Sequence, residues 1–127
     1  MEVKVITNNS KSCMLKSLDG HIELTITDNV EEVVSASRDY LMNGWILAAD
    51  PLAGHRGRPN PYISVILRQN RGSEYIGEDI LRVEYLLYIF NMELKNRSYD
   101  EKVLDDYREV DFSILLNALK GLDKYIL

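Results

Sequence analysis

The 127-residue sequence has little of what usually anchors or cross-links a small protein. Cys13 is the single cysteine, so no internal disulfide can form, and a reducing cytoplasmic environment is expected. No apolar run approaches the roughly 20 residues that a membrane-spanning helix needs. The first residues, MEVKVITNN, lack the basic and apolar regions of a secretory signal. We therefore expect a soluble, cytoplasmic protein with no membrane as its partner.

Positive charge and metal-binding side chains are also scarce. The chain carries 15 Lys and Arg against 20 Asp and Glu, a net charge of −5. This balance argues against nucleic acid as a partner, because such binding depends on attraction to phosphates. The two histidines are far apart, and no paired-ligand spacing surrounds them, so no metal site is predicted. Neither a P-loop nor a GxGxxG motif is present, and the sequence identifies no cofactor.

What is present indicates one globular domain over residues 1–127. Hydrophobic residues make up 46% of the chain and charged residues 28%, which are ordinary globular values. Alternating β-branched runs and helical periodicity predict strands at 3–7, 21–27, 45–49 and 62–69, and helices at 10–18, 30–42 and 74–96.

The last two predicted strands are joined by about a dozen residues without a helical pattern. A parallel connection normally requires a helix, so we expect this pair to be antiparallel, with an ordered loop between the strands. Beyond residue 96, we expect a charged helix from Ser98 to Val110, then a helix capped by Asp111 and ended by Gly121. The predicted fold class is α/β: β-α-β-α-β-β and two or three C-terminal helices, with a mixed sheet in a two-layer or three-layer arrangement.

All three prolines fall within residues 48–64, together with two glycines, one histidine and two arginines. In an open α/β sheet, the loops after the carboxyl ends of parallel strands meet at one edge, where ligands bind. If strands 3–7 and 45–49 are parallel, the TNN turn at 7–9 and the loop at 50–62 share that edge. Paired arginines can grip a carboxylate or phosphate, and glycines let backbone amides approach it. The predicted ligand-binding residues are Thr7, Asn8, Asn9, Asp50, Gly54, His55, Arg56, Arg58, Asn60 and Tyr62.

Structural explanations compete with this hypothesis. Asn8 and Asn9 are residue types that form turns and helix caps. Arg56 and Arg58 also fit a solvated loop tip, and His55 has no identifiable partner for proton chemistry.

Five short motifs together resemble the GrdX family, small bacterial proteins encoded with the glycine, sarcosine and betaine reductase systems. They are TNN (7–9), RDYLMNG (38–44), PLAG (51–54), PN (59–60) and PYISV (61–65).

The resemblance covers about residues 7–67, and the segment between Asn60 and Pro61 is shorter than the family pattern by one or two residues. Three substitutions are further departures. Asp50 stands where the family pattern has His before Pro-Leu, His55 stands for Ser, and Arg58 stands for Lys. An aspartate at position 50 excludes an imidazole mechanism there. The resemblance implies a shared fold, a shared loop and an association with amino-acid reduction. It implies no reaction, since the family has no established activity to transfer.

Three hypotheses about function follow. The favoured one is an accessory or metabolite-binding protein, whose 50–62 loop and TNN turn hold a small anionic metabolite or the acidic group of a protein partner. The second is a small enzyme with Asp50 or His55 as acid/base and Arg56 and Arg58 as an anion clamp. The third is a structural or assembly subunit that forms a homo-oligomer through its C-terminal helices. Whether the protein is an enzyme is left open.

Overall fold

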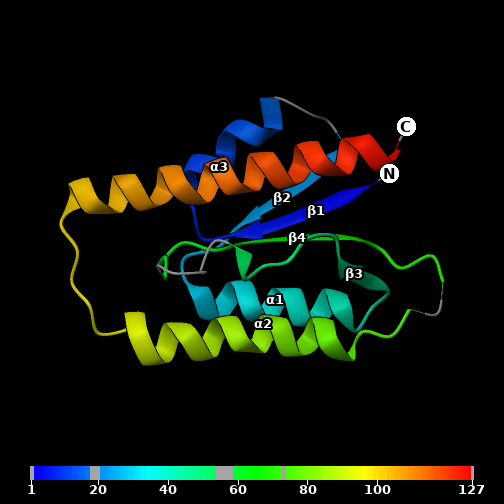
Figure 1. The fold of residues 1–127 in the computed structure, drawn as a ribbon, viewed down its shortest axis with the longest axis horizontal. Helices are drawn as coiled ribbons and strands as arrows, with labels where there is room; N and C mark the ends of the chain where they lie inside the picture. The colour runs from blue at the N-terminus through cyan, green and yellow to red at the C-terminus, as the bar shows by residue number, and fades with distance from the viewer. Residues whose placement is uncertain (1, 18–20, 54–58, 73, 127) are drawn as a thin grey trace.

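Four strands form one mixed sheet, which helices cover on both faces (Figure 1). The computed structural model describes residues 2–17, 21–53, 59–72 and 74–126. Its elements are β1 (Val3–Thr7), the 3₁₀ helix η1 (Ser10–Ser17), β2 (Ile22–Ile26), α1 (Val30–Leu41), β3 (Trp45–Leu47), β4 (Ser64–Gln69), α2 (Gly77–Ile89), the π-helical turn η3 (Phe90–Leu94) and α3 (Glu101–Ile126). Within these residues, no helix is long and apolar enough to cross a membrane.

The strand order in the sheet is β2-β1-β4-β3. β1 pairs parallel with β2, and β4 runs antiparallel to both β1 and β3. The predicted α/β class and the antiparallel β3–β4 pair are therefore confirmed. β1 and β3 point the same way with β4 between them, so their carboxyl ends lie at the same edge of the sheet, as expected.

β4 begins two residues later than predicted because side chains take the place of a neighbouring strand. The backbone N–H of Tyr62 donates to Asn60 Oδ1, and that of Ile63 donates to Asn8 Oδ1. These bonds satisfy the backbone without a strand partner. Strand β3 is also shorter than predicted and ends at Leu47.

The residues of α1 follow the predicted pattern. Asn29 caps the helix by accepting a 2.8 Å hydrogen bond from the N–H of Glu32. Gly44 follows the helix with φ of 92°, a left-handed conformation that favours glycine. The side chains predicted to face the core are all buried, and they are Val30, Val33, Val34, Ser37 and Leu41.

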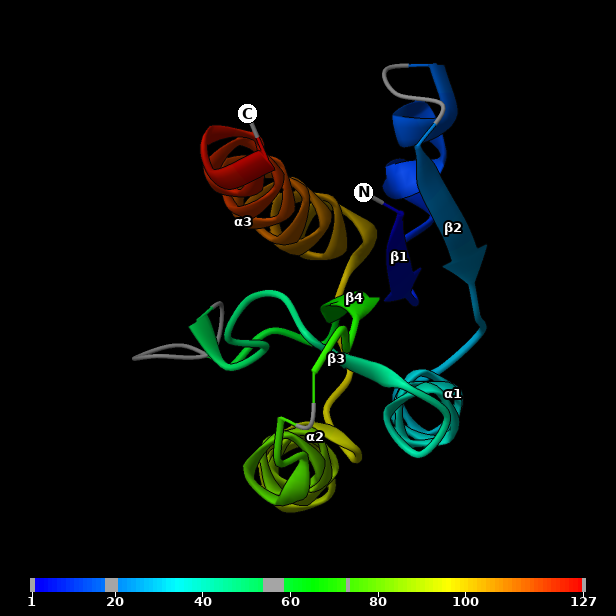
Figure 2. The ribbon, with the colours of Figure 1, turned by 90° about the vertical axis from the view of Figure 1, so that its right-hand side faces the viewer.

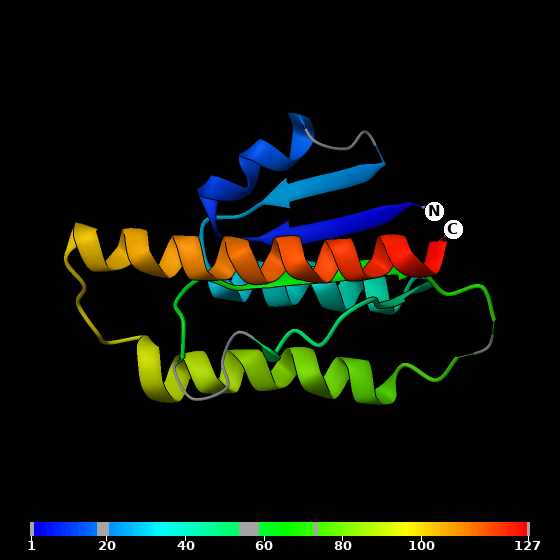
Figure 3. The same cartoon turned by 45° about the horizontal axis from the view of Figure 1, so that its top comes forward.

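The sheet lies between two hydrophobic clusters, which makes the architecture three-layered. On one face, α1 and α2 bury residues such as Val33 and Leu86 against Ile6 and Val65. On the other face, η1 and α3 bury Leu15, Phe112 and Leu115 against Val3, Val5 and Ile66. Figures 2 and 3 show α3 on one side of the sheet and the α1–α2 pair on the other.

The predicted boundary between two C-terminal helices is wrong. A single helix, α3, runs from Glu101 to Ile126, so Asp111 lies in its middle instead of capping a new helix. No Pro or Gly interrupts residues 101–120, and Leu104, Leu115 and Ala118 keep helical spacing across the expected break. Gly121 lies within the helix. Likewise, α2 starts at Gly77 instead of Glu74.

Candidate functional site

The end of β1 and the start of β4 meet through their hydroxyl side chains. Thr7 lies opposite Ser64 in the sheet, and their Oγ atoms are 2.9 Å apart. Thr7 Oγ1 also lies 2.7 Å from the carbonyl oxygen of Ile63, to which it donates. The predicted convergence of the TNN turn with the C-terminal end of the 50–62 loop is therefore present.

Asn8 fixes this loop end through both halves of its amide. Its Nδ2 donates to the carbonyl of Pro61 at 3.0 Å, and its Oδ1 accepts from the N–H of Ile63 at 2.9 Å. The pair of bonds holds residues 61–63 against the end of β1. In this structure, the Asn8 side chain therefore positions the loop.

Asn9 connects the same turn to α3. Its Nδ2 donates to Asp111 Oδ2 at 2.9 Å and to the carbonyl of Arg108 at 3.0 Å. Its Oδ1 accepts from the N–H of Lys11 at 3.1 Å, at the start of η1. Asn9 is fully buried, so these bonds form away from water.

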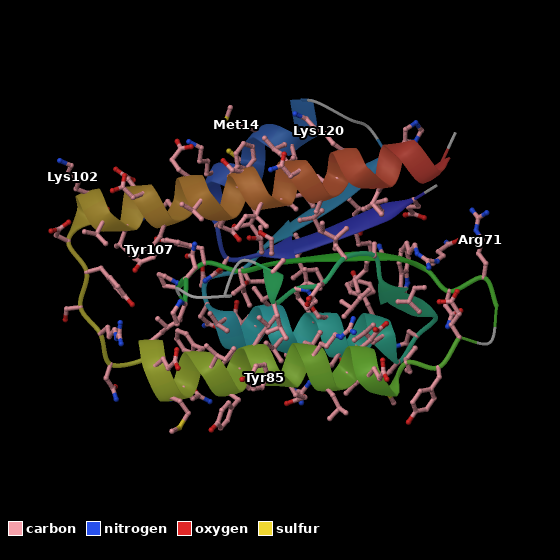
Figure 4. All side chains as sticks on the ribbon, viewed as in Figure 1. Met14, Arg71, Tyr85, Lys102, Tyr107 and Lys120 are labelled. Atoms are coloured by element: carbon pink, nitrogen blue, oxygen red, sulfur yellow. The ribbon has the colours of Figure 1, made fainter. Side chains whose placement is uncertain are left out.

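Asn60 and Tyr62 also contact α3. Asn60 Nδ2 donates to the carbonyl of Tyr107 at 3.0 Å. Figure 4 shows Tyr107 in the first half of α3. The guanidinium of Arg108 lies over the ring of Tyr62, 5.1 Å from its centroid. Both predicted residues thus help to attach α3 to the edge of the sheet.

Asp50 shapes the turn after β3. Its Oδ1 accepts from the N–H of Leu52 at 2.9 Å, and its carbonyl accepts from the N–H of Ala53 at 3.2 Å. The remaining predicted residues, Gly54, His55, Arg56 and Arg58, lie outside the residues that the structure describes, so their role stays a prediction.

A cavity of about 90 Å³ lies between β4, α3 and residues 49–53. Its polar lining comes from Asp50, Ser64 and Asp111, and the rest is mostly apolar, including Ile66 and Leu115. A single water needs roughly 10–15 Å³ of such space, so the cavity has room for a molecule of a few heavy atoms.

Asp111 is the most unusual group in this lining. Only 7% of the residue is exposed, and burial raises the pKa of its carboxyl because an ionised group loses its hydration there. Hydrogen bonds from Asn9 and Ser64 act in the opposite direction. Among the described residues, no cation forms an ion pair with it.

A chain of hydroxyl contacts leads from Asp111 to the backbone of Ile63. Ser64 Oγ is 2.9 Å from Asp111 Oδ2, and the contacts continue to Thr7 and then to the carbonyl of Ile63. An ionised Asp111 leaves two hydroxyl protons for these three contacts. Ser64 donates one of them to Asp111 Oδ2, and Thr7 donates the other to the carbonyl of Ile63.

Asp111 and Ser64 were missing from the sequence-based set of site residues. The sequence contained a signal for Asp111, because it occupies an otherwise apolar stripe that includes Leu104, Leu115 and Ala118. An acidic residue in such a stripe indicates a buried carboxylate. Within the described parts of the chain, no cluster of three or more His, Cys, Asp or Glu side chains could hold a metal ion.

Fold and site together define a three-layer α/β protein with a small, mostly apolar cavity that Asp50, Ser64 and Asp111 also line. The family model described as GrdX-like protein matches residues 4–120, and the chain belongs to this family. The match extends past the motifs at residues 7–67 and includes most of α3. No curated protein and no solved structure matches the chain significantly.

Proposed function

We propose that this protein is an accessory protein that binds a small metabolite in the cavity between β4 and α3, with an ammonium group of the ligand against Asp111. The carboxylate of Asp111 is the observation that carries the proposal. It is buried, it lines the cavity, and its two recorded hydrogen bonds both involve Oδ2 and neutral partners. A buried carboxylate is costly without a countercharge, and an ammonium ligand would supply one.

The acidic side chains of the cavity make it unsuited to an anionic group of the ligand. Asp50 and Asp111 both line the cavity, so they would repel a ligand that is only anionic. Arg56 and Arg58, which lie outside the described residues, remain the predicted anion-binding residues. A small zwitterion would combine an ammonium group for the cavity with a carboxylate for these predicted anion-binding residues.

The family resemblance suggests which zwitterions to try first. The resemblance associates the GrdX family with the reductases of glycine, sarcosine and betaine, and we propose these three compounds as candidates for the cavity of about 90 Å³. The three compounds also differ in their ammonium N–H groups, since betaine has none. Comparing their binding therefore distinguishes ligands that can donate a hydrogen bond to Asp111 from betaine, which can only be attracted to its charge.

A thermal-shift screen tests the proposal. We expect glycine to raise the melting temperature more than acetate or methylammonium, because neither of these carries both charges. A ligand at about 100 times its dissociation constant adds roughly 2.7 kcal/mol of stability. Asp111→Asn should abolish the shift, whereas Asp106→Asn, at an exposed position of the same helix, should leave it unchanged.

Arg56→Ala with Arg58→Ala tests the second half of the proposal. This variant should reduce the response to glycine to that of methylammonium. A screen without any shift, or a full glycine response in Asp111→Asn, would contradict the proposed site.

A further inference from the structure

The outer side of α2 and of the adjoining turn η3 carries an apolar stripe. Its members are Leu81, Tyr85, Tyr88 and Met92, which are exposed by 69%, 49%, 57% and 67%. The rings of Tyr85 and Tyr88 stack on each other with centroids 5.8 Å apart. Figure 2 shows α2 at the margin of the molecule, and Figure 4 shows Tyr85 on this helix. Tyrosine and methionine are enriched in protein interfaces, so the stripe is suited to contact with another protein.

The order of side chains along the stripe is self-complementary. Leu81 precedes Tyr85 by four residues, and Met92 follows Tyr88 by four. A two-fold axis through the middle of the stripe therefore places each Tyr85 on a partner Tyr88 and each Leu81 on a partner Met92. We propose that this stripe is a self-association surface, on which a second copy of the chain packs its own α2 in antiparallel orientation.

Charged residues beside the stripe favour the same partner and orientation. Arg82 follows Leu81 by one position and Glu93 follows Met92 by one, so both flank the stripe on the same side of the helix. In a two-fold antiparallel pair, a side chain at one end of the stripe lies next to the second copy's side chain from the opposite end, provided that both flank the stripe on the same side. Each Arg82 thus comes to lie near Glu93 of the second copy. Both side chains are exposed, and neither has an ion pair within the described residues.

Sedimentation velocity over a wide range of protein concentration tests this surface. Since one stripe per chain gives a small interface, we expect a monomer–dimer equilibrium in the micromolar range. Arg82→Glu alone and Glu93→Arg alone should each weaken the dimer at least tenfold, because each places like charges opposite each other. The double variant should restore it, since the charges are then exchanged. Recovery in the double variant is specific to self-pairing in this orientation.

The control separates this surface from the C-terminal helix. Val103 and Val110 are exposed apolar residues of α3, seven positions apart on one face. Val103→Glu with Val110→Glu should leave the dimer intact, while Tyr85→Glu should abolish it, with unchanged helical circular dichroism in both. A wild-type protein that stays monomeric at several hundred micromolar overturns the proposal. Dissociation by the α3 variant, or no recovery in the charge exchange, also overturns it.

Discussion

The buried side chains of Thr7 and Asp111 and the half-buried side chain of Ser64 form a chain of contacts that ends at the backbone of Ile63. These three side chains are hydrogen-bonded to one another in series. The protonation of Asp111 therefore affects the hydrogen bonds of Ser64 and Thr7 as well. Because Asp111 lines the cavity, its protonation state also sets what the cavity attracts. The chemistry of the candidate site therefore depends mainly on this one carboxyl group.

The raised pKa of Asp111 makes folding stability depend on pH. The folded protein keeps this proton at pH values where the unfolded carboxyl has lost it, so unfolding releases a proton. The free energy of unfolding contributed by Asp111 should fall as the pH rises above about 4, and it should level off above the raised pKa. The loss is about 1.4 kcal/mol for each unit by which burial raises the pKa.

Asp111→Asn should remove this dependence. In urea denaturation between pH 4 and pH 8, we expect the stability of the variant to rise relative to wild type as the pH increases. Asp106→Asn serves as the control, because its side chain is exposed on the same helix. A constant difference between wild type and Asp111→Asn over this range would show that Asp111 is not shifted as described.

Asn8 should matter for stability through its two bonds to the loop. Asn8→Ala leaves the carbonyl of Pro61 and the N–H of Ile63 without these partners, which costs about 1–3 kcal/mol. Asn117→Ala, at an exposed position of α3, should change stability by less than about 0.5 kcal/mol. Equal effects of the two substitutions in urea denaturation would mean that Asn8 does not fix the loop.

At the scale of the elements, local sequence determined most of the helices and strands. The cap at Asn29, the stop at Gly44 and the apolar spacing of α1 were each visible in the residues themselves. The predicted helix boundary at Asp111 was wrong because an aspartate can either cap a helix or lie buried within one. The contact of Asp111 with β4 distinguishes the two roles, and the neighbouring residues in the sequence do not predict that contact.

The continuity of α3 can be tested at Val110. This side chain is half exposed, so a substitution there removes little packing. Val110→Pro should cost about 3 kcal/mol or more, since proline in a helix interior removes a hydrogen bond and clashes with the preceding turn. Val110→Ala should be nearly neutral. If a helix boundary lay between residues 110 and 111, proline would be tolerated there and the two variants would unfold alike.

At the scale of the whole molecule, the site joins residues that are far apart in the chain. Asn9 reaches Asp111 across 102 positions, and Ser64 reaches it across 47. The shared edge of β1 and β3 could be predicted, since it follows from strand direction. The position of α3 over that edge could not, because many helix placements bury the same apolar stripe. The sequence therefore predicted that the ends of β1 and β3 share an edge, and it did not predict that Asp111 of α3 lies near the end of β1.

The central claim is that the cavity binds an ammonium group against Asp111. An NMR titration of the ¹⁵N-labelled protein with glycine tests it most directly. We predict saturable shifts at the amides of Ser64, Asp111 and Ala118, with an affinity that rises with pH because binding favours the ionised Asp111. These shifts should be absent in Asp111→Asn. If those amides do not shift saturably in wild type, or if they shift equally in the variant, the claim is contradicted.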